Sequence, residues 1–175
     1  MYLTALIANY LSDKFMLLVV DNHNALVPVF DIFYYVVSEQ ILMFDKFYLP
    51  DVFIGLSLVF AYPYSLSAAF IKMHTVILLI RFLCVITTSG YVSMRYARFY
   101  DTRGLFNGLH ADLIISGHAM YKTLCIIFII HNSGVIYSLL CVPVLMFGIL
   151  TNLLVGDHYT SDIILGISLA ILVYY

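Results

Sequence analysis

The chain has 175 residues, of which 63% are hydrophobic and 10% charged, with a formal net charge of −2 and a mean hydropathy of +1.02. Soluble domains carry about 25% charged residues, so this composition excludes an ordinary water-soluble globule. The small negative net charge gives no reason to expect nucleic acid as a partner. We therefore expect a single integral membrane domain over residues 1–175, embedded in the bilayer.

Successive apolar runs predict an all-α fold, a bundle of about six transmembrane helices of roughly 20 residues each. Pro63 is expected to kink the second span, because membrane helices tolerate proline. The stretch 21–45 is either a further span or a helix lying in the membrane interface. The arginine-rich segment 93–110 is predicted as the longest loop. The expected spans cover residues 2–20, 49–70, 75–91, 113–130, 135–155 and 158–175.

The fourth and sixth predicted spans each begin close to a histidine, His118 and His158. A tight connection at residues 131–134 joins the fourth span to the fifth, so these two spans form a hairpin. Both histidines should then emerge on the same side of the bilayer. This expectation holds whatever the number of spans before them.

His158 and Asp162 are four residues apart, a spacing that places both side chains on one helix face. A carboxylate there can accept a hydrogen bond from one ring nitrogen and fix the tautomer, leaving the other nitrogen to attack phosphorus. The alternative is a polar pair that only caps or packs the helix start. Ionisable residues at membrane depth are costly and usually functional, which favours a catalytic pair.

The second motif is Ser116-Gly117-His118. Serine is a good helix N-cap, glycine allows close approach of the backbone to a ligand, and a helix N-terminus attracts phosphate. His118 could then protonate a departing alkoxide as a general acid. Taken alone, the tripeptide is more typical of an ordinary capped helix with a surface histidine. The two motifs together favour phosphoryl transfer.

Arg81 lies inside the third predicted span, where a guanidinium needs a partner. Phosphate suits it through bidentate hydrogen bonds, while an internal carboxylate or snorkelling to the surface is the alternative. Asp112, Asp157 and Tyr159 flank the histidine motifs and are candidate headgroup contacts. The two aspartates can also be helix-start carboxylates favoured by the helix dipole. Lys122, one turn after the first histidine, either lines the site or snorkels.

The sequence contains no CxxC, HExxH or DxD pattern, so we expect neither a metal nor another cofactor. The three cysteines lie in apolar runs and are expected to be packed thiols. The remaining histidines lie near span ends or in loops and are expected to be solvated: His23, His74, His110 and His131.

The paired motifs resemble those of the sphingomyelin synthase-related family, part of the wider type 2 phosphatidic acid phosphatase superfamily. They read Asp-Leu-Ile-Ile-Ser-Gly-His-Ala at 112–119 and Asp-His-Tyr-Thr-Ser-Asp-Ile at 157–163. Arg81 followed by Thr88 is similar to the arginine motif of that family, which continues to Leu-Pro where this chain has Ser-Gly. The likeness covers about residues 75–175. An early Leu-Pro-Asp element has two candidates here, at 49–51 and at 28–31.

The resemblance implies a six-helix membrane enzyme that moves a phosphorylated headgroup from a glycerophospholipid donor to a ceramide-type acceptor. His158 would be the nucleophile that forms a phosphohistidine, Asp162 would orient it, and His118 would act as acid and base. The protein would be multi-pass, in the Golgi, endoplasmic reticulum or plasma membrane. Its active face would be lumenal or extracellular.

Two other functions remain open at this point. A lipid phosphate phosphatase would use the same residues with water as the acceptor, although the lysine-to-arginine-proline motif usual in that branch is not found ahead of Ser116. A non-catalytic membrane protein that binds lipid would retain the motifs without turnover.

Overall fold

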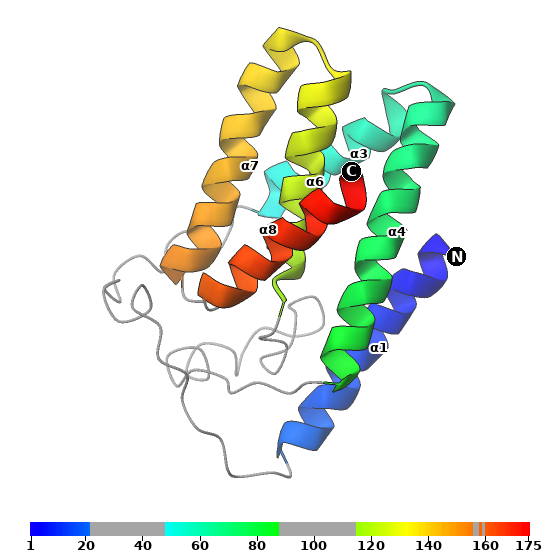
Figure 1. Cartoon of the computed structure of the whole chain (residues 1–175), viewed down its shortest axis with the longest axis vertical. Helices are drawn as coiled ribbons and strands as arrows, with labels where there is room; N and C mark the ends of the chain where they lie inside the picture. The colour runs from blue at the N-terminus through cyan, green and yellow to red at the C-terminus, as the bar shows by residue number, and fades with distance from the viewer. Residues whose placement is uncertain (22–47, 88–114, 156–157, 159) are drawn as a thin grey trace.

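The computed structural model of the chain describes residues 1–21, 48–87, 115–155, 158 and 160–175 (Figure 1). Within these ranges every regular element is a helix, which confirms the predicted all-α fold class. The described helices are α1 (Tyr2–Asp21), α3 (Tyr48–Phe60), α4 (Tyr64–Thr87), α6 (Gly117–Asn132), α7 (Val135–Val155) and α8 (Thr160–Tyr174).

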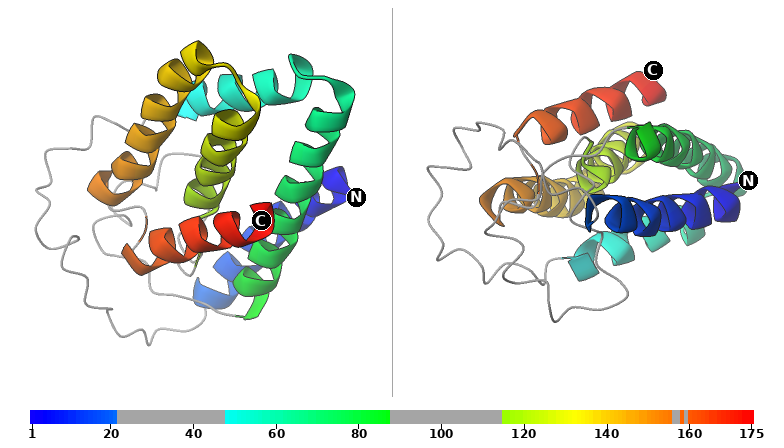
Figure 2. Two further views of the ribbon diagram at one scale, coloured as in Figure 1. Left: turned by 45° about the horizontal axis from the view of Figure 1, so that its top comes forward. Right: turned by 90° about the horizontal axis from the view of Figure 1, so that it is seen from below.

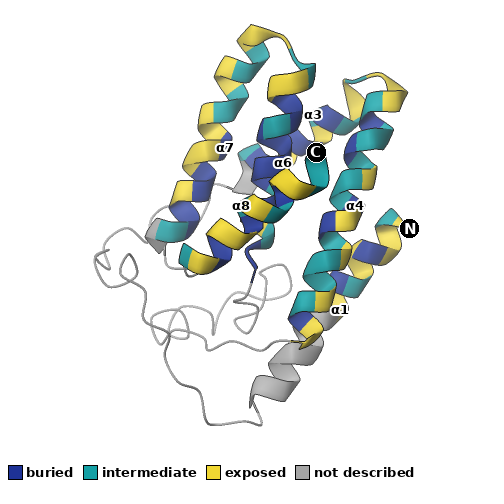
Figure 3. Ribbon diagram, viewed as in Figure 1, coloured by how far each residue is buried: buried dark blue, intermediate teal, exposed yellow. Residues whose placement is uncertain are grey.

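The helices pack in three layers, seen most clearly from below (Figure 2). Helices α4, α6 and α7 form the middle layer, α8 crosses one face of it, and α1 and α3 cover the other. Helix α6 is central, because it contacts α3, α4, α7 and α8. Its side chains are buried along most of its length (Figure 3). The helix that carries the Ser-Gly-His motif is therefore held from several sides.

The outer faces of the bundle are apolar. On α7, Val135, Ile136, Leu139 and Leu140 are each between 66% and 77% exposed. Large exposed apolar surfaces are unfavourable in water and suit contact with lipid. Helices α4 and α7 are the two described helices that are long and apolar enough to cross a membrane. These features indicate a membrane protein, whereas the count of six spans stays a prediction because α3 has only 13 residues.

The predicted second span, 49–70, is wrong. Pro63 does not kink one helix; α3 ends before it and α4 begins after it. Proline lacks an N–H and disfavours the helical conformation of the residue before it, so the chain breaks there. The Pro63 carbonyl then accepts the N–H groups of Leu66 and Ser67, both at 3.0 Å, and starts α4. The predicted third span, 75–91, is thus the second part of one longer helix.

The other predicted spans agree better with the structure. Helix α7 has the predicted bounds, and α1, α6 and α8 lie within a few residues of theirs. The short connection between α6 and α7 confirms the predicted hairpin. The stretches 21–45 and 93–110 lie almost wholly outside the described residues, apart from Asp21 at the end of α1.

Two of the histidines predicted to be solvated are in contact with aromatic rings. His74 lies within α4 and is half-buried; its Nδ1 is 3.0 Å from the Tyr2 hydroxyl, and its ring centroid is 5.0 Å from that of Tyr121. His131, in the last turn of α6, lies 5.2 Å from the Tyr174 ring. The prediction for His74 is wrong because α4 is longer than expected, which places this residue in the packed part of a helix.

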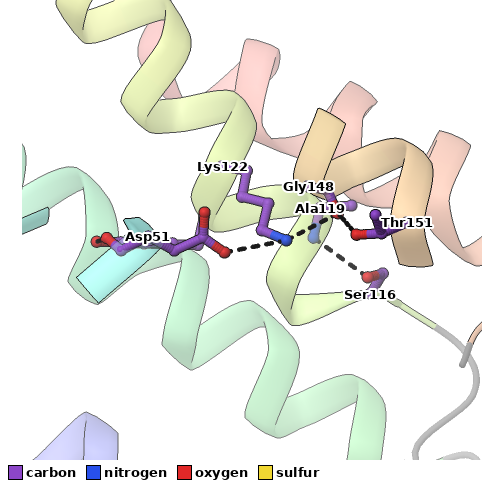
Figure 4. Close-up of polar contacts among 7 residues, drawn as sticks. Asp51, Ser116, Ala119, Lys122, Gly148 and Thr151 are labelled. Carbon is purple, nitrogen blue, oxygen red and sulfur yellow. Dashed lines mark hydrogen bonds and ion pairs between the residues drawn. The ribbon is translucent and has the colours of Figure 1, made fainter. Parts of the chain in front are cut away.

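A buried ion pair connects three helices (Figure 4). Lys122 Nζ of α6 lies 3.0 Å from Asp51 Oδ2 of α3 and donates a hydrogen bond of 2.8 Å to the Gly148 carbonyl of α7. Thr151 donates to the same carbonyl. A Cβ at Gly148 would lie 2.8 Å from Lys122 Nζ, so the glycine leaves room for the ammonium group. Lys122 is therefore buried within the bundle, so the predicted snorkelling is wrong.

We predict that Lys122→Met strongly destabilises the protein. The substitution leaves the Asp51 carboxylate buried without its cation, and breaking a buried pair costs about 3–5 kcal/mol. The measurement is the midpoint of thermal unfolding in detergent. Adding Asp51→Asn should recover much of the loss, since neither charge then remains.

The matched control is Lys72→Met, which removes an exposed lysine from α4 and should change the midpoint little. Equal stability of Lys122→Met and Lys72→Met would contradict a structural role for the ion pair.

Candidate active site

The start of α6 is fixed by its cap. The side chain of Ser116 accepts a hydrogen bond of 3.2 Å from the Ala119 N–H, and its carbonyl accepts one of 3.0 Å from the Met120 N–H. This confirms the predicted N-cap. Ser116 is fully buried, so the cap contact is sheltered from water. The next two residues, Gly117 and His118, lie in the first turn of α6, so the cap fixes their position at the helix start.

The starts of α6 and α8 are in direct contact, which places the two motifs together as the hairpin predicts. The Ser116 N–H donates a hydrogen bond of 3.2 Å to the Asp162 carbonyl. One turn further along α8, a Cβ at Gly166 would lie 2.8 Å from the Ser116 carbonyl oxygen and 3.3 Å from Ala119 Cβ. Glycine at this position therefore permits the close crossing of the two helices.

His158 and Asp162 lie side by side at this junction. Nδ1 of His158 is 4.0 Å from Oδ2 of Asp162, which is ion-pair range but longer than a hydrogen bond. The two side chains are 11% and 6% exposed. Ser161 Oγ donates to the other carboxylate oxygen at 3.3 Å. With Nδ1 turned toward the carboxylate, Nε2 is the nitrogen left to attack a substrate.

Arg81 of α4 lies against the first turn of α6. A Cβ at Gly117 would be 2.7 Å from Arg81 Nε and 3.0 Å from its Cδ, so only glycine allows the guanidinium this close to the helix start. Nη1 of Arg81 donates a hydrogen bond of 2.8 Å to Asn9 Oδ1 of α1. The three predicted phosphate-binding residues, Arg81, Ser116 and Gly117, are therefore neighbours.

The electrostatic surroundings of His158 include the other two basic groups of the site. Burial, together with the neighbouring His118 and Arg81, lowers the pKa of the His158 imidazole to about 3. His158 lies ahead of the first residue of α8, outside the helices. Its ring is therefore neutral near pH 7, the form with a lone pair for attack. His118 is exposed and open to a substrate.

Not every predicted site residue is placed. Asp112, Asp157 and Tyr159, the candidate headgroup contacts, lie outside the described residues. Two residues that the sequence analysis did not consider contribute to the site. Asn9 holds Arg81, and Gly166 sets the distance between α6 and α8. A lone asparagine in an apolar run was the available signal for Asn9; nothing distinguishes Gly166 from other helix glycines in the sequence.

Residues 111–175 match the family described as PAP2 superfamily C-terminal. This match supports the type 2 phosphatidic acid phosphatase superfamily. The matched stretch contains both histidine motifs and ends with α8. It supports an enzyme with lipid phosphatase or phosphotransferase activity, without separating the sphingomyelin synthase-related branch from the rest. No curated protein and no solved structure matches the chain.

We predict that Gly166→Ala weakens the contact between α6 and α8. Its methyl group would meet the Ser116 carbonyl, a backbone atom that cannot turn away, and overpacking of this kind costs about 1–3 kcal/mol. The thermal unfolding midpoint in detergent should fall. The matched control is Gly134→Ala, where a Cβ meets nothing within 4 Å. Equal midpoints for the two variants would show that the crossing is not tight.

Proposed function

We propose that the chain is a membrane lipid phosphotransferase that moves a phospho-headgroup from a glycerophospholipid to a ceramide-type acceptor through a phosphohistidine. The observation that carries the proposal is the position of His158. It lies beside the Asp162 carboxylate, and the Asp162 carbonyl accepts the Ser116 N–H at the start of α6, the helix turn that carries His118 and lies against Arg81. The superfamily match supports lipid phosphoryl chemistry in general; the ceramide acceptor rests on the motif resemblance.

In the first half-reaction, Nε2 of His158 attacks the phosphorus of the donor. A nitrogen–phosphorus bond forms and the bond from phosphorus to the diacylglycerol oxygen breaks. His118 gives that oxygen its proton, so neutral diacylglycerol leaves. The Asp162 carboxylate, 4.0 Å from Nδ1, stabilises the positive charge that develops on the imidazole.

In the second half-reaction, the primary hydroxyl of the acceptor attacks the phosphohistidine. His118, now neutral, takes the hydroxyl proton. The nitrogen–phosphorus bond breaks, the phosphorylated sphingolipid leaves, and His158 returns to its neutral state. Each half-reaction restores the protonation that the other one needs, so the cycle consumes no external acid or base.

The phosphoryl oxygens carry the charge during both steps. Arg81 supplies a fixed positive charge beside the first turn of α6, whose N–H groups and dipole also favour an anion. Preorganised donors of this kind provide much of the rate enhancement in phosphoryl transfer. Ser116 contributes by capping that turn, and Gly117 by letting the guanidinium approach it.

The bundle surface suits lipid substrates. The exposed apolar side chains of α4, α7 and α8 would face the hydrocarbon region, so that donor and acceptor can reach the helix starts laterally from the bilayer. We place the protein in the membranes of the Golgi, endoplasmic reticulum or cell surface as a multi-pass protein with its active face lumenal or extracellular. This placement rests on the motif resemblance alone.

A lipid phosphate phosphatase is the second candidate, and the superfamily match favours it as much as transfer. Water would replace the acceptor hydroxyl in the second half-reaction, with the same residues in the same roles. The two functions differ only in whether water or a lipid hydroxyl attacks the phosphohistidine. Identifying the products therefore distinguishes a phosphatase from a transferase.

We predict that His158→Ala abolishes both headgroup transfer and labelling of the protein. Purified protein incubated with a donor lipid radiolabelled at phosphorus should acquire an acid-labile, base-stable label, as a phosphoramidate does. His118→Ala should slow turnover by at least ~100-fold, the usual effect of losing a general acid. The control is His131→Ala, at the far end of α6, which should keep full activity.

The acceptor is tested with fluorescent ceramide. In cells lacking such synthases, expression of the chain should produce a new fluorescent phosphosphingolipid, and release of inorganic phosphate without that product would support the phosphatase instead.

EDTA should leave the rate unchanged, because histidine and arginine side chains supply the nucleophile, the acid and the positive charge. A loss of activity that added metal restores would contradict this scheme.

A further inference from the structure

Asn9 of α1, a residue far from both histidine motifs in the sequence, accepts a hydrogen bond from the arginine of the candidate site. Asn9 is 5% exposed and lies in the first half of α1. A polar amide in an apolar helix is costly unless its hydrogen bonds are made. Here they are made: the amide contacts the Ala5 carbonyl of α1, the Leu78 carbonyl of α4 and the Arg81 guanidinium.

The orientation of the Asn9 amide is fixed from both ends. Its Nδ2 donates to the Ala5 carbonyl at 3.0 Å within α1 and to the Leu78 carbonyl at 2.5 Å on α4. These two acceptors require the nitrogen on that side, so the oxygen faces Arg81 and accepts from its Nη1 at 2.8 Å. A guanidinium has only donors, which agrees with this orientation.

The guanidinium is thereby held between two elements. The Asn9 oxygen lies at Nη1, while Nε and Cδ lie close to the position of a Cβ at Gly117. A long, flexible arginine side chain loses entropy when it is fixed, and a contact made before substrate binding lowers that cost at the moment of binding. The contact therefore aims Arg81 at the first turn of α6.

The chemistry of the contact is as informative as its geometry. An amide oxygen accepts a hydrogen bond but brings no net charge, whereas a carboxylate at the same place would form an ion pair with Arg81 and offset its attraction for an anion. Asparagine and aspartate have nearly the same shape. A carboxylate also cannot donate to the Ala5 and Leu78 carbonyls, so holding α1 against α4 depends on the amide nitrogen, whereas leaving the charge of Arg81 in place depends on the amide oxygen.

We propose that Asn9 is a positioning residue of the phosphate site, one that orients Arg81 without neutralising it. The substrate group that Arg81 then recognises is a dianionic or monoanionic phosphoryl group. This inference rests on the proposed function, since it assigns Arg81 to phosphoryl binding. It extends the site to α1, outside the segment that carries the histidine motifs.

The test uses the full-length protein in detergent with orthovanadate, a phosphate analogue, as the probe. Vanadate affinity is read from the shift in unfolding midpoint on titration, and KM and kcat are measured with the lipid donor. Asn9→Asp should weaken vanadate binding by at least about tenfold and raise KM more than it lowers kcat. Its midpoint without vanadate should also fall, because a carboxylate cannot donate to the Ala5 and Leu78 carbonyls. Asn9→Ala should weaken binding and also lower that midpoint.

The matched control is Asn132→Asp, the same change at the far end of α6, where the amide nitrogen donates to the Phe128 carbonyl. It should leave vanadate affinity and KM unchanged. Wild-type vanadate affinity in Asn9→Asp would overturn the inference, because an amide that only holds α1 against α4 would change the midpoint and leave the affinity unchanged. Wild-type protein that binds vanadate but moves no headgroup would instead reject the proposed function, while the loss of vanadate binding in Asn9→Asp would still support the role of Asn9.

Discussion

The close approach of α8 to the first turn of α6 is the constraint on which the candidate site depends. Gly166 leaves room for the Ser116 carbonyl, and the Ser116 N–H bonds to the Asp162 carbonyl. This contact brings together two motifs that are separated by a whole helical hairpin. Without it, His118 and His158 would be two unrelated polar residues at the ends of two apolar helices.

The two cations packed near α6, Lys122 and Arg81, contact groups of different charge, and this difference separates their roles. Lys122 is paired with the Asp51 carboxylate, so its charge is offset and it joins α3, α6 and α7. Arg81 is held by the neutral amide of Asn9, a contact that leaves the positive charge of the guanidinium in place.

Local patterns could be read from the sequence, whereas long-range contacts could not. The bounds of α7 follow from one uninterrupted apolar run, and the Ser116 cap follows from residue types that act within one helical turn. The break at Pro63 was missed because proline is compatible with either a kink or a helix start, and packing of the flanking helices decides between them. Asn9 and Asp51 were missed because their partners lie on helices distant in the sequence.

The most direct test of the account is the stereochemical course at phosphorus. A donor lipid made chiral at phosphorus with oxygen isotopes is converted to product, and the configuration of the product is determined. Each attack inverts the phosphorus centre, so transfer through a His158 intermediate requires two inversions and predicts overall retention. Overall inversion would show that acceptor displaces donor in a single step, and it would contradict a covalent role for His158.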